Sequence, residues 1–167
     1  MSYRRLSFWV ALAIILVTAL TVFIVYLRIA RLPFIQINIL GITNTPVHWL
    51  GWAGSIIILT TTVAYSLMKR AKHRASSRLL KFHAFGNLIG FTFISIHFIH
   101  EVTRSASSYP VLGTGIVLYS AMVILVVTGF TTYFVVRPSW VRYYKWLHPA
   151  VALALLMVII VHIIHGI

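Results

Sequence analysis

Residues 83–100 read HAFGNLIGFTFISIHFIH, and residues 148–165 repeat the same histidine pattern as HPAVALALLMVIIVHIIH. In both stretches thirteen residues separate the first two histidines, and two residues separate the second from the third. Apolar runs of this length predict membrane-spanning helices. Fourteen residues advance about 21 Å along a helix and fall about 40° short of four turns. The first two histidines of each helix are therefore expected on nearly one face, close to opposite membrane surfaces.

The composition agrees with a membrane protein, because 60% of the 167 residues are hydrophobic and only 9% are charged. The chain has no cysteine, which excludes disulfides, iron–sulfur clusters and c-type haem attachment. Glu101 is the only acidic residue, which argues against carboxylate catalysis, calcium binding and a carboxylate proton relay. The net charge of +13 is attributed to loops that contact anionic lipid, and nucleic acid is not expected as a partner.

Five segments are long and apolar enough to span a bilayer. They lie near Phe8–Leu27, Val47–Met68, Phe82–Glu101, Val111–Val136 and Tyr144–His165. The first is expected to be a retained helix, since its apolar run exceeds a usual signal core and lacks an Ala-x-Ala-like cleavage site. The predicted fold is an all-α polytopic bundle that forms a single domain over residues 1–167.

The basic residues predict the orientation of these spans. Eleven Lys and Arg residues lie before the first span or in the links that follow the second and fourth spans, whereas only three lie on the other side. The positive-inside rule then places the N-terminus in the cytoplasm and the C-terminus outside, in a plasma membrane. The third and fifth spans consequently run in parallel.

Parallel spans place His83 at the depth of His148, and His97 at the depth of His162. Neutral imidazole is an axial ligand of haem iron, so the four histidines predict two bis-histidine haem b sites, one near each surface. The alternative for any single histidine is an interfacial side chain, but the repeated spacing favours ligation.

Other residues are candidates around these haems. Gly86 and Gly90 would admit a flat ring, or would serve ordinary helix packing. At the depth of the inner haem, Lys81, Arg142 and Lys145 are candidate partners for its propionates, and Arg104, His48 and Trp49 are the candidates at the outer one.

A second group of polar residues is predicted at the outer surface: His48, His100, Glu101 and His165. They would accept protons from a quinol or contact haem propionates. The twin His-x-x-His pairs, together with His48, could instead bind zinc or copper. Glu101 also stands three residues before Arg104, which favours an ordinary ion pair.

The histidine pair of residues 83–97 and the stretch Thr128-Gly129…Arg137…Trp146-Leu147-His148…His162 resemble the ferric reductase-like transmembrane family. The resemblance covers mainly Lys81–Ile167, about half of the chain. It implies two haems held by His83 with His148 and by His97 with His162. Family reductases often carry a flavin and nicotinamide module and commonly have six spans, whereas these 167 residues contain no such module and five predicted spans. Haem binding carries over, and ferric reductase activity does not.

The sequence therefore predicts transmembrane electron transfer by a subunit of an oxidoreductase complex, with a quinol pool or a partner redox subunit at one end. Two other functions remain open at this point. One is a metal-binding or transport protein that uses the outer histidines, and the other is a structural subunit without a cofactor.

Overall fold

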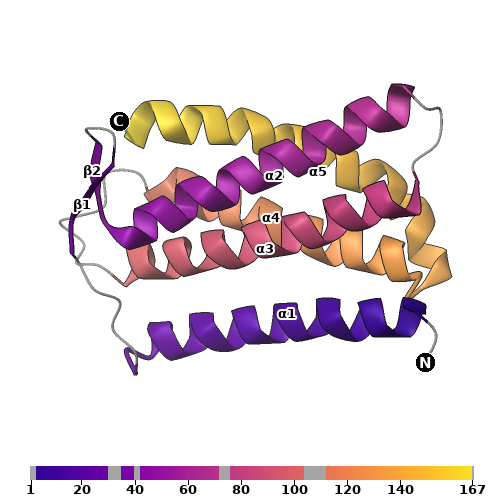
Figure 1. The fold of residues 1–167 in the computed structure, drawn as a ribbon, viewed down its shortest axis with the longest axis horizontal. Helices are drawn as coiled ribbons and strands as arrows, with labels where there is room; N and C mark the ends of the chain where they lie inside the picture. Colours follow the sequence, from indigo (N-terminus) through magenta and orange to yellow (C-terminus); the bar gives the residue numbers. More distant parts are fainter. Residues whose placement is uncertain (1–2, 30–34, 40–41, 72–75, 104–111, 167) are drawn as a thin grey trace. The chain divides into compact units, whose positions relative to one another are not determined.

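The computed structural model describes residues 3–29, 35–39, 42–71, 76–103 and 112–166 (Figure 1). Five helices follow one another: α1 (Tyr3–Tyr26), α2 (Pro46–Ala71), α3 (Ser77–Val102), α4 (Leu112–Phe134) and α5 (Pro138–Gly166). All five are long and apolar enough to cross a membrane. The predicted all-α class and the five predicted spans are confirmed. By contacts the chain divides into two compact units, Met1–Thr103 and Arg104–Ile167, and each is described by itself.

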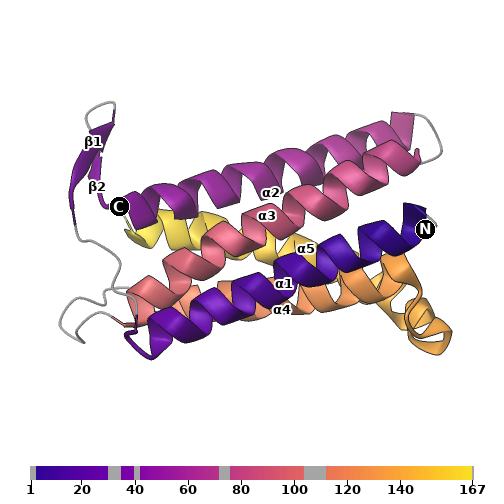
Figure 2. The same cartoon turned by 60° about the horizontal axis from the view of Figure 1, so that its bottom comes forward.

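In the first unit, α2 packs antiparallel against α3, and α1 lies along the other side of α3 (Figure 2). The contact between α2 and α3 is close because glycines face each other across it. A Cβ atom on Gly54 would lie 2.8 Å from the Gly90 carbonyl oxygen, and one on Gly90 would lie 2.6 Å from Cγ1 of Ile58. The contact between α1 and α3 includes a hydrogen bond of 2.8 Å between the hydroxyls of Thr18 and Thr92.

Local sequence sets where these helices begin. The hydroxyl of Ser76 accepts a hydrogen bond of 3.1 Å from the Leu79 amide and so caps the N-terminus of α3. Proline is the first residue of both α2 and α5, where its missing N–H costs no helical hydrogen bond. As a result α5 begins at Pro138, earlier than the predicted Tyr144.

Helices α1 and α4 end in the same way, with a residue in the left-handed region. Arg28 has φ of 58° and Val135 has φ of 54°. The amide of Val136 then bonds back to the carbonyl of Thr131 at 3.2 Å, as in a Schellman motif. Glycine is the usual residue at this position, because a Cβ atom crowds the left-handed backbone.

In the second unit, α4 and α5 form an antiparallel pair. Pro149 lies inside α5, directly after His148. It has no N–H to donate to the carbonyl one turn earlier, so the helical ladder is interrupted beside a candidate ligand.

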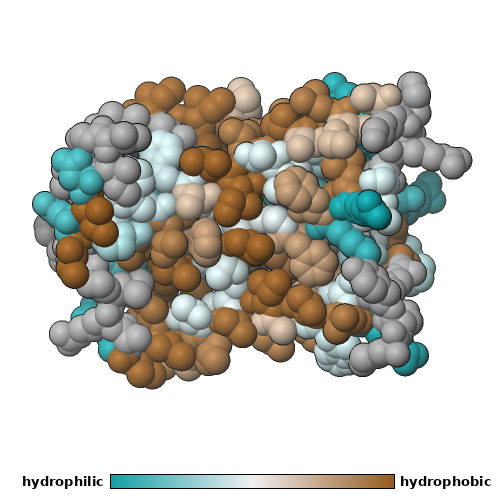
Figure 3. Space-filling view, viewed as in Figure 1, coloured by the Kyte–Doolittle hydropathy of each residue, from teal (hydrophilic) through white to brown (hydrophobic). Residues whose placement is uncertain are grey.

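Hydrophobic side chains cover much of the helix surface on the face drawn in Figure 3, whereas hydrophilic residues gather towards helix ends. Many large apolar residues in the spans are more than half exposed, among them Leu16, Leu67 and Met157. Such surfaces are stable in lipid and unstable in water. The chain is therefore a multi-pass integral membrane protein in contact with lipid.

A short hairpin between α1 and α2 was not predicted. Strands β1 (Ile37–Ile39) and β2 (Ile42–Asn44) pair antiparallel, with Ile37 opposite Asn44. The alternation Ile-Asn-Ile, followed by Leu-Gly, is a strand and turn signal, but it is only a few residues long beside five strong helical signals.

Candidate functional site

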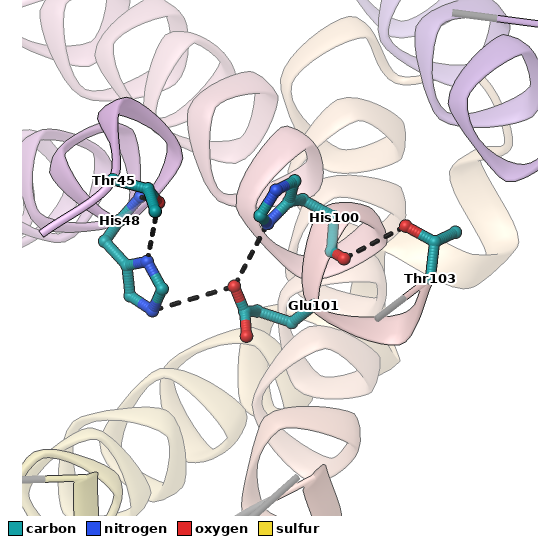
Figure 4. A network of polar contacts seen from close by, with 5 residues as sticks. All are labelled: Thr45, His48, His100, Glu101 and Thr103. Carbon is teal, nitrogen blue, oxygen red and sulfur yellow. Dashed lines mark hydrogen bonds and ion pairs between the residues drawn. The ribbon is translucent and has the colours of Figure 1, made fainter. Parts of the chain in front are cut away.

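At one end of the first unit, the sole carboxylate of the chain lies between two histidines (Figure 4). Oε1 of Glu101 is 3.6 Å from Nε2 of His48 and 3.1 Å from Nδ1 of His100. The His100 side chain is only 3% exposed, and those of His48 and Glu101 are 28% and 21% exposed. Because α2 and α3 are antiparallel, the first turn of α2 meets the last turns of α3, which brings these residues together.

His97 joins the same end of the unit. Its ring centroid is 5.2 Å from that of His48, with the planes at 65°. Ligand atoms of His48, His97 and Glu101 all lie within 4.8 Å of one another, close enough to hold a metal ion. Gly51 makes room for the His97 ring, because a Cβ atom there would lie 2.9 Å from the ring's Cγ.

His83 lies on α3 against a different part of α2. Its ring stacks on Tyr65 with centroids 4.6 Å apart and planes at 21°. Nδ1 of His83 is 3.1 Å from the Asn87 side-chain amide, which also contacts the hydroxyl of Thr61 at 2.7 Å. Tyr65, Thr61 and Asn87 thus orient the His83 ring from two sides.

The Asn87 amide links Thr61 to His83. The hydroxyl of Thr61 lies 2.8 Å from the Ile57 carbonyl and donates to Oδ1 of Asn87 at 2.7 Å. The amide nitrogen of Asn87 then faces His83, 3.1 Å from its Nδ1. Because an amide NH₂ only donates, Nδ1 of His83 accepts in this arrangement.

The two histidines of the second unit are held in a matching way. Nδ1 of His148 lies 2.9 Å from the Thr128 hydroxyl, and Nδ1 of His162 lies 2.8 Å from the Thr114 hydroxyl. The glycine after each threonine faces the same ring. A Cβ atom on Gly129 would lie 3.2 Å from Cε1 of His148, and one on Gly115 would lie 3.9 Å from Cε1 of His162.

The Thr128 hydroxyl also determines the tautomer of His148. It donates to the Ile124 carbonyl at 2.7 Å, so it accepts from the ring. Nδ1 of His148 is then the protonated nitrogen, and Nε2 carries the lone pair that binds metals. Metal-binding histidines ordinarily have this second contact, which fixes the ring and raises its basicity.

Gly86 and Gly90, which were expected to admit a haem or to serve helix packing, lie at the contact of α3 with α2. A Cβ atom on Gly86 would lie 2.5 Å from Cγ2 of Thr61, and Gly90 lies against Ile58 and Gly54. Both glycines therefore allow α2 to approach α3.

The remaining predicted residues are partly described. Lys81 lies in the second turn of α3 and is half-buried, and Arg142 is exposed near the start of α5. Each is within two helical turns of the first histidine of its own helix. Arg104 and the side chain of His165 lie outside the described residues, so the predicted pairing of Glu101 with Arg104 stays a prediction.

Sequence reasoning did not predict which residues contact the histidines, although Thr128-Gly129 formed part of the family resemblance. A signal was present, because Thr114-Gly115 and Thr128-Gly129 are fourteen residues apart, the same spacing as His148 and His162. Two antiparallel helices with equal spacing bring both pairs into register. Tyr65, Asn87 and Gly51 had no comparable repeat.

Comparison with models of protein families, with curated proteins and with solved structures gives no match. The case for a function therefore depends on the residues described above.

Proposed function

We propose that this chain is a membrane cytochrome that binds two b-type haems through histidine pairs and transfers electrons across the membrane. One observation carries this function. On α5, His148 and His162 stand fourteen residues apart, and Nδ1 of each lies within hydrogen-bond distance of a threonine hydroxyl on α4. A single histidine–threonine contact is common. Two such contacts with the same fourteen-residue spacing on both helices are expected where two similar ligands are needed at two depths.

The donor set fits haem iron. An imidazole that donates from Nδ1 offers Nε2, the nitrogen through which histidine binds haem as an axial ligand. His148 has this tautomer because Thr128 gives its own proton to Ile124. At His83, the Asn87 amide contacts Nδ1 and orients the ring.

The proposed pairs are His83 with His148 and His97 with His162. Equal spacing on α3 and α5 supports them, together with the parallel orientation that the basic loops predict. When bound, two haems would supply one-electron redox centres near the two membrane surfaces. The chain would provide the ligands and hold their rings through α2 and α4.

Polar residues near the two ends of the spans would bind haem propionates and accept protons. Lys81 and Arg142 would pair with inner haem propionates, and Arg104 with outer ones. His48, His100 and Glu101 would accept protons if a quinol is the outer donor. A partner redox subunit is the other donor or acceptor that fits, and resemblance to the ferric reductase-like family extends to haem binding alone.

An absorption spectrum of the purified chain, first oxidised and then reduced with dithionite, tests this function. Protein produced with adequate haem should show low-spin b-type bands and two haems per chain. Absence of these bands would end the proposal.

Histidine variants test the pairing. His83→Ala and His162→Ala should each remove one haem, and the double variant should remove both. His83→Ala combined with His148→Ala should remove no more haem than either single change. Loss of both haems when His83→Ala is combined with His148→Ala would show that the pairing is wrong.

A further inference from the structure

His48 and Glu101 are not ligands in the proposed haem pairs, although both lie at the end of the first unit that holds His97. These two residues come from different helices and meet beside His97. Glu101 is the only acidic side chain in a chain of net charge +13, and it lies among histidines, so this end of the first unit offers a mixed imidazole and carboxylate donor set.

The distance between His48 and Glu101 suits two ligands of one ion better than a direct bond. Nε2 of His48 is 3.6 Å from Oε1 of Glu101. A hydrogen bond between nitrogen and oxygen is about 2.7–3.2 Å long. Two ligands that are each about 2.0–2.1 Å from a tetrahedral zinc ion stand about 3.3 Å apart. The observed separation is closer to this second value.

His48 is held by a second contact, as metal-binding histidines are. Its Nδ1 lies 2.8 Å from the hydroxyl of Thr45, and Nε2 points towards Glu101 (Figure 4). If Nδ1 donates to Thr45, the lone pair of Nε2 faces a carboxylate oxygen, and a cation between the two groups removes their repulsion. His100 adds a contact of 3.1 Å from Nδ1 to the same carboxylate oxygen and so orients Glu101.

Gly51 completes the site by admitting the third ligand. His97 can lie beside His48 because residue 51 has no side chain, and a Cβ atom there would come within 3.2 Å of three ring atoms of His97. Two imidazoles and one carboxylate form a known donor set for zinc, with a fourth position left for water.

We propose that His48, His97 and Glu101 bind one Zn²⁺ ion at this end of the first unit. This inference goes beyond the cytochrome function. It meets that function at His97, because one imidazole nitrogen binds one metal at a time. Zn²⁺ and the haem ligated by His97 therefore exclude each other, and the ion binds chains that lack this haem.

The test uses the full chain in detergent, produced under restricted haem supply and treated with a chelator. Co²⁺ is the probe, since it replaces Zn²⁺ and absorbs visible light in a site with nitrogen and oxygen ligands. One Co²⁺ per chain is expected, and Zn²⁺ should displace it. His48→Ala and Glu101→Gln should weaken Co²⁺ binding by about tenfold or more, judging from the usual loss of metal affinity on such changes.

His73→Ala is the matched control, because it removes a histidine that belongs neither to the proposed site nor to the haem pairs, and it should bind Co²⁺ as the unchanged chain does. Glu101→Gln keeps the size of the side chain, so its effect is separable from misfolding by circular dichroism. Co²⁺ binding that is absent, or unchanged in both His48→Ala and Glu101→Gln, would overturn the inference and leave an ordinary histidine–glutamate ion pair.

The competition at His97 has its own readout. Chains loaded with Zn²⁺ before haem is supplied should take up one haem fewer than chains without Zn²⁺. Equal haem uptake would refute the mutual exclusion. If Co²⁺ binds but haem-supplied protein lacks b-type bands, the metal site is supported and the cytochrome function is refuted. If b-type bands are present but Co²⁺ does not bind, the cytochrome function is supported and the metal site is refuted.

Discussion

The hydroxyl of Thr128 lies 2.9 Å from Nδ1 of His148 and gives its own proton to the Ile124 carbonyl at 2.7 Å. The Ile124 carbonyl of α4 therefore fixes the tautomer of His148 on α5. Nδ1 of His148 carries the proton, and Nε2 carries the lone pair. The relationship makes Thr128 a positioning residue for the proposed ligand.

Thr128→Ala should weaken haem retention at His148 by about 10- to 100-fold, the usual cost of removing such a contact. Haem content after repeated detergent exchange, measured with the redox spectrum, gives the result. Thr128→Ser keeps the hydroxyl and should restore retention. If alanine and serine variants retain haem equally, the hydroxyl does not support the ligand.

Gly90→Ala should destabilise the first unit, because the new Cβ atom would lie 2.6 Å from Cγ1 of Ile58 and 2.9 Å from the Gly54 carbonyl oxygen. Overpacking of this kind costs about 1–3 kcal/mol. Thermal unfolding in detergent should show a lower Tm. Gly113→Ala is the control, since no atom of the described residues lies within 4 Å of a Cβ atom there. A Tm that falls equally in both variants would contradict the close contact of α2 with α3.

Val135→Gly should stabilise the end of α4. Val135 has φ of 54°, a conformation that costs a residue with a Cβ atom about 1–2 kcal/mol. Glycine removes that cost but gains freedom in the unfolded chain, so a net gain of about 1 kcal/mol is expected. The variant should have a higher Tm than the unchanged protein. A lower Tm would contradict the left-handed conformation at the end of α4.

The orientation of the spans can be measured because the chain has no cysteine of its own. Ile35 is 64% exposed between α1 and α2, and Ser77 is exposed at the start of α3. Under the positive-inside rule, Ile35→Cys should react with a membrane-impermeant maleimide in intact cells. Ser77→Cys should react only after the cells are opened. The reverse pattern would invert the predicted topology.

The sequence was sufficient for the five helices, because long apolar runs have one stable form in lipid. Helix ends were less predictable, since they depend on local contacts such as the Ser76 cap and the prolines that begin α2 and α5. Hydropathy reports the lipid-facing length of a helix and misses the polar turns beyond it, which is why α5 begins at Pro138.

The site was predictable only in part. Repeated spacing singled out the histidines on α3 and α5 as candidates, because period and helix geometry act within one helix. It did not reveal that His97 lies beside His48 and Gly51, since that contact depends on how α2 crosses α3. Glycines mark such crossings in a sequence, but they do not say which partner each one faces.

The tight seam of α2 and α3 also bears on the order in which the protein is made. These helices are neighbours in the chain, and their contact needs nothing that is synthesised later. They can pair as soon as residue 102 has left the ribosome, whereas His148 and His162 come last. During that interval His83 and His97 are in the membrane without their proposed partners. Tyr65 and Asn87 contact the His83 ring, and His48 contacts the His97 ring, before α5 is made. In the proposed cytochrome, haem loading would then follow the insertion of α5.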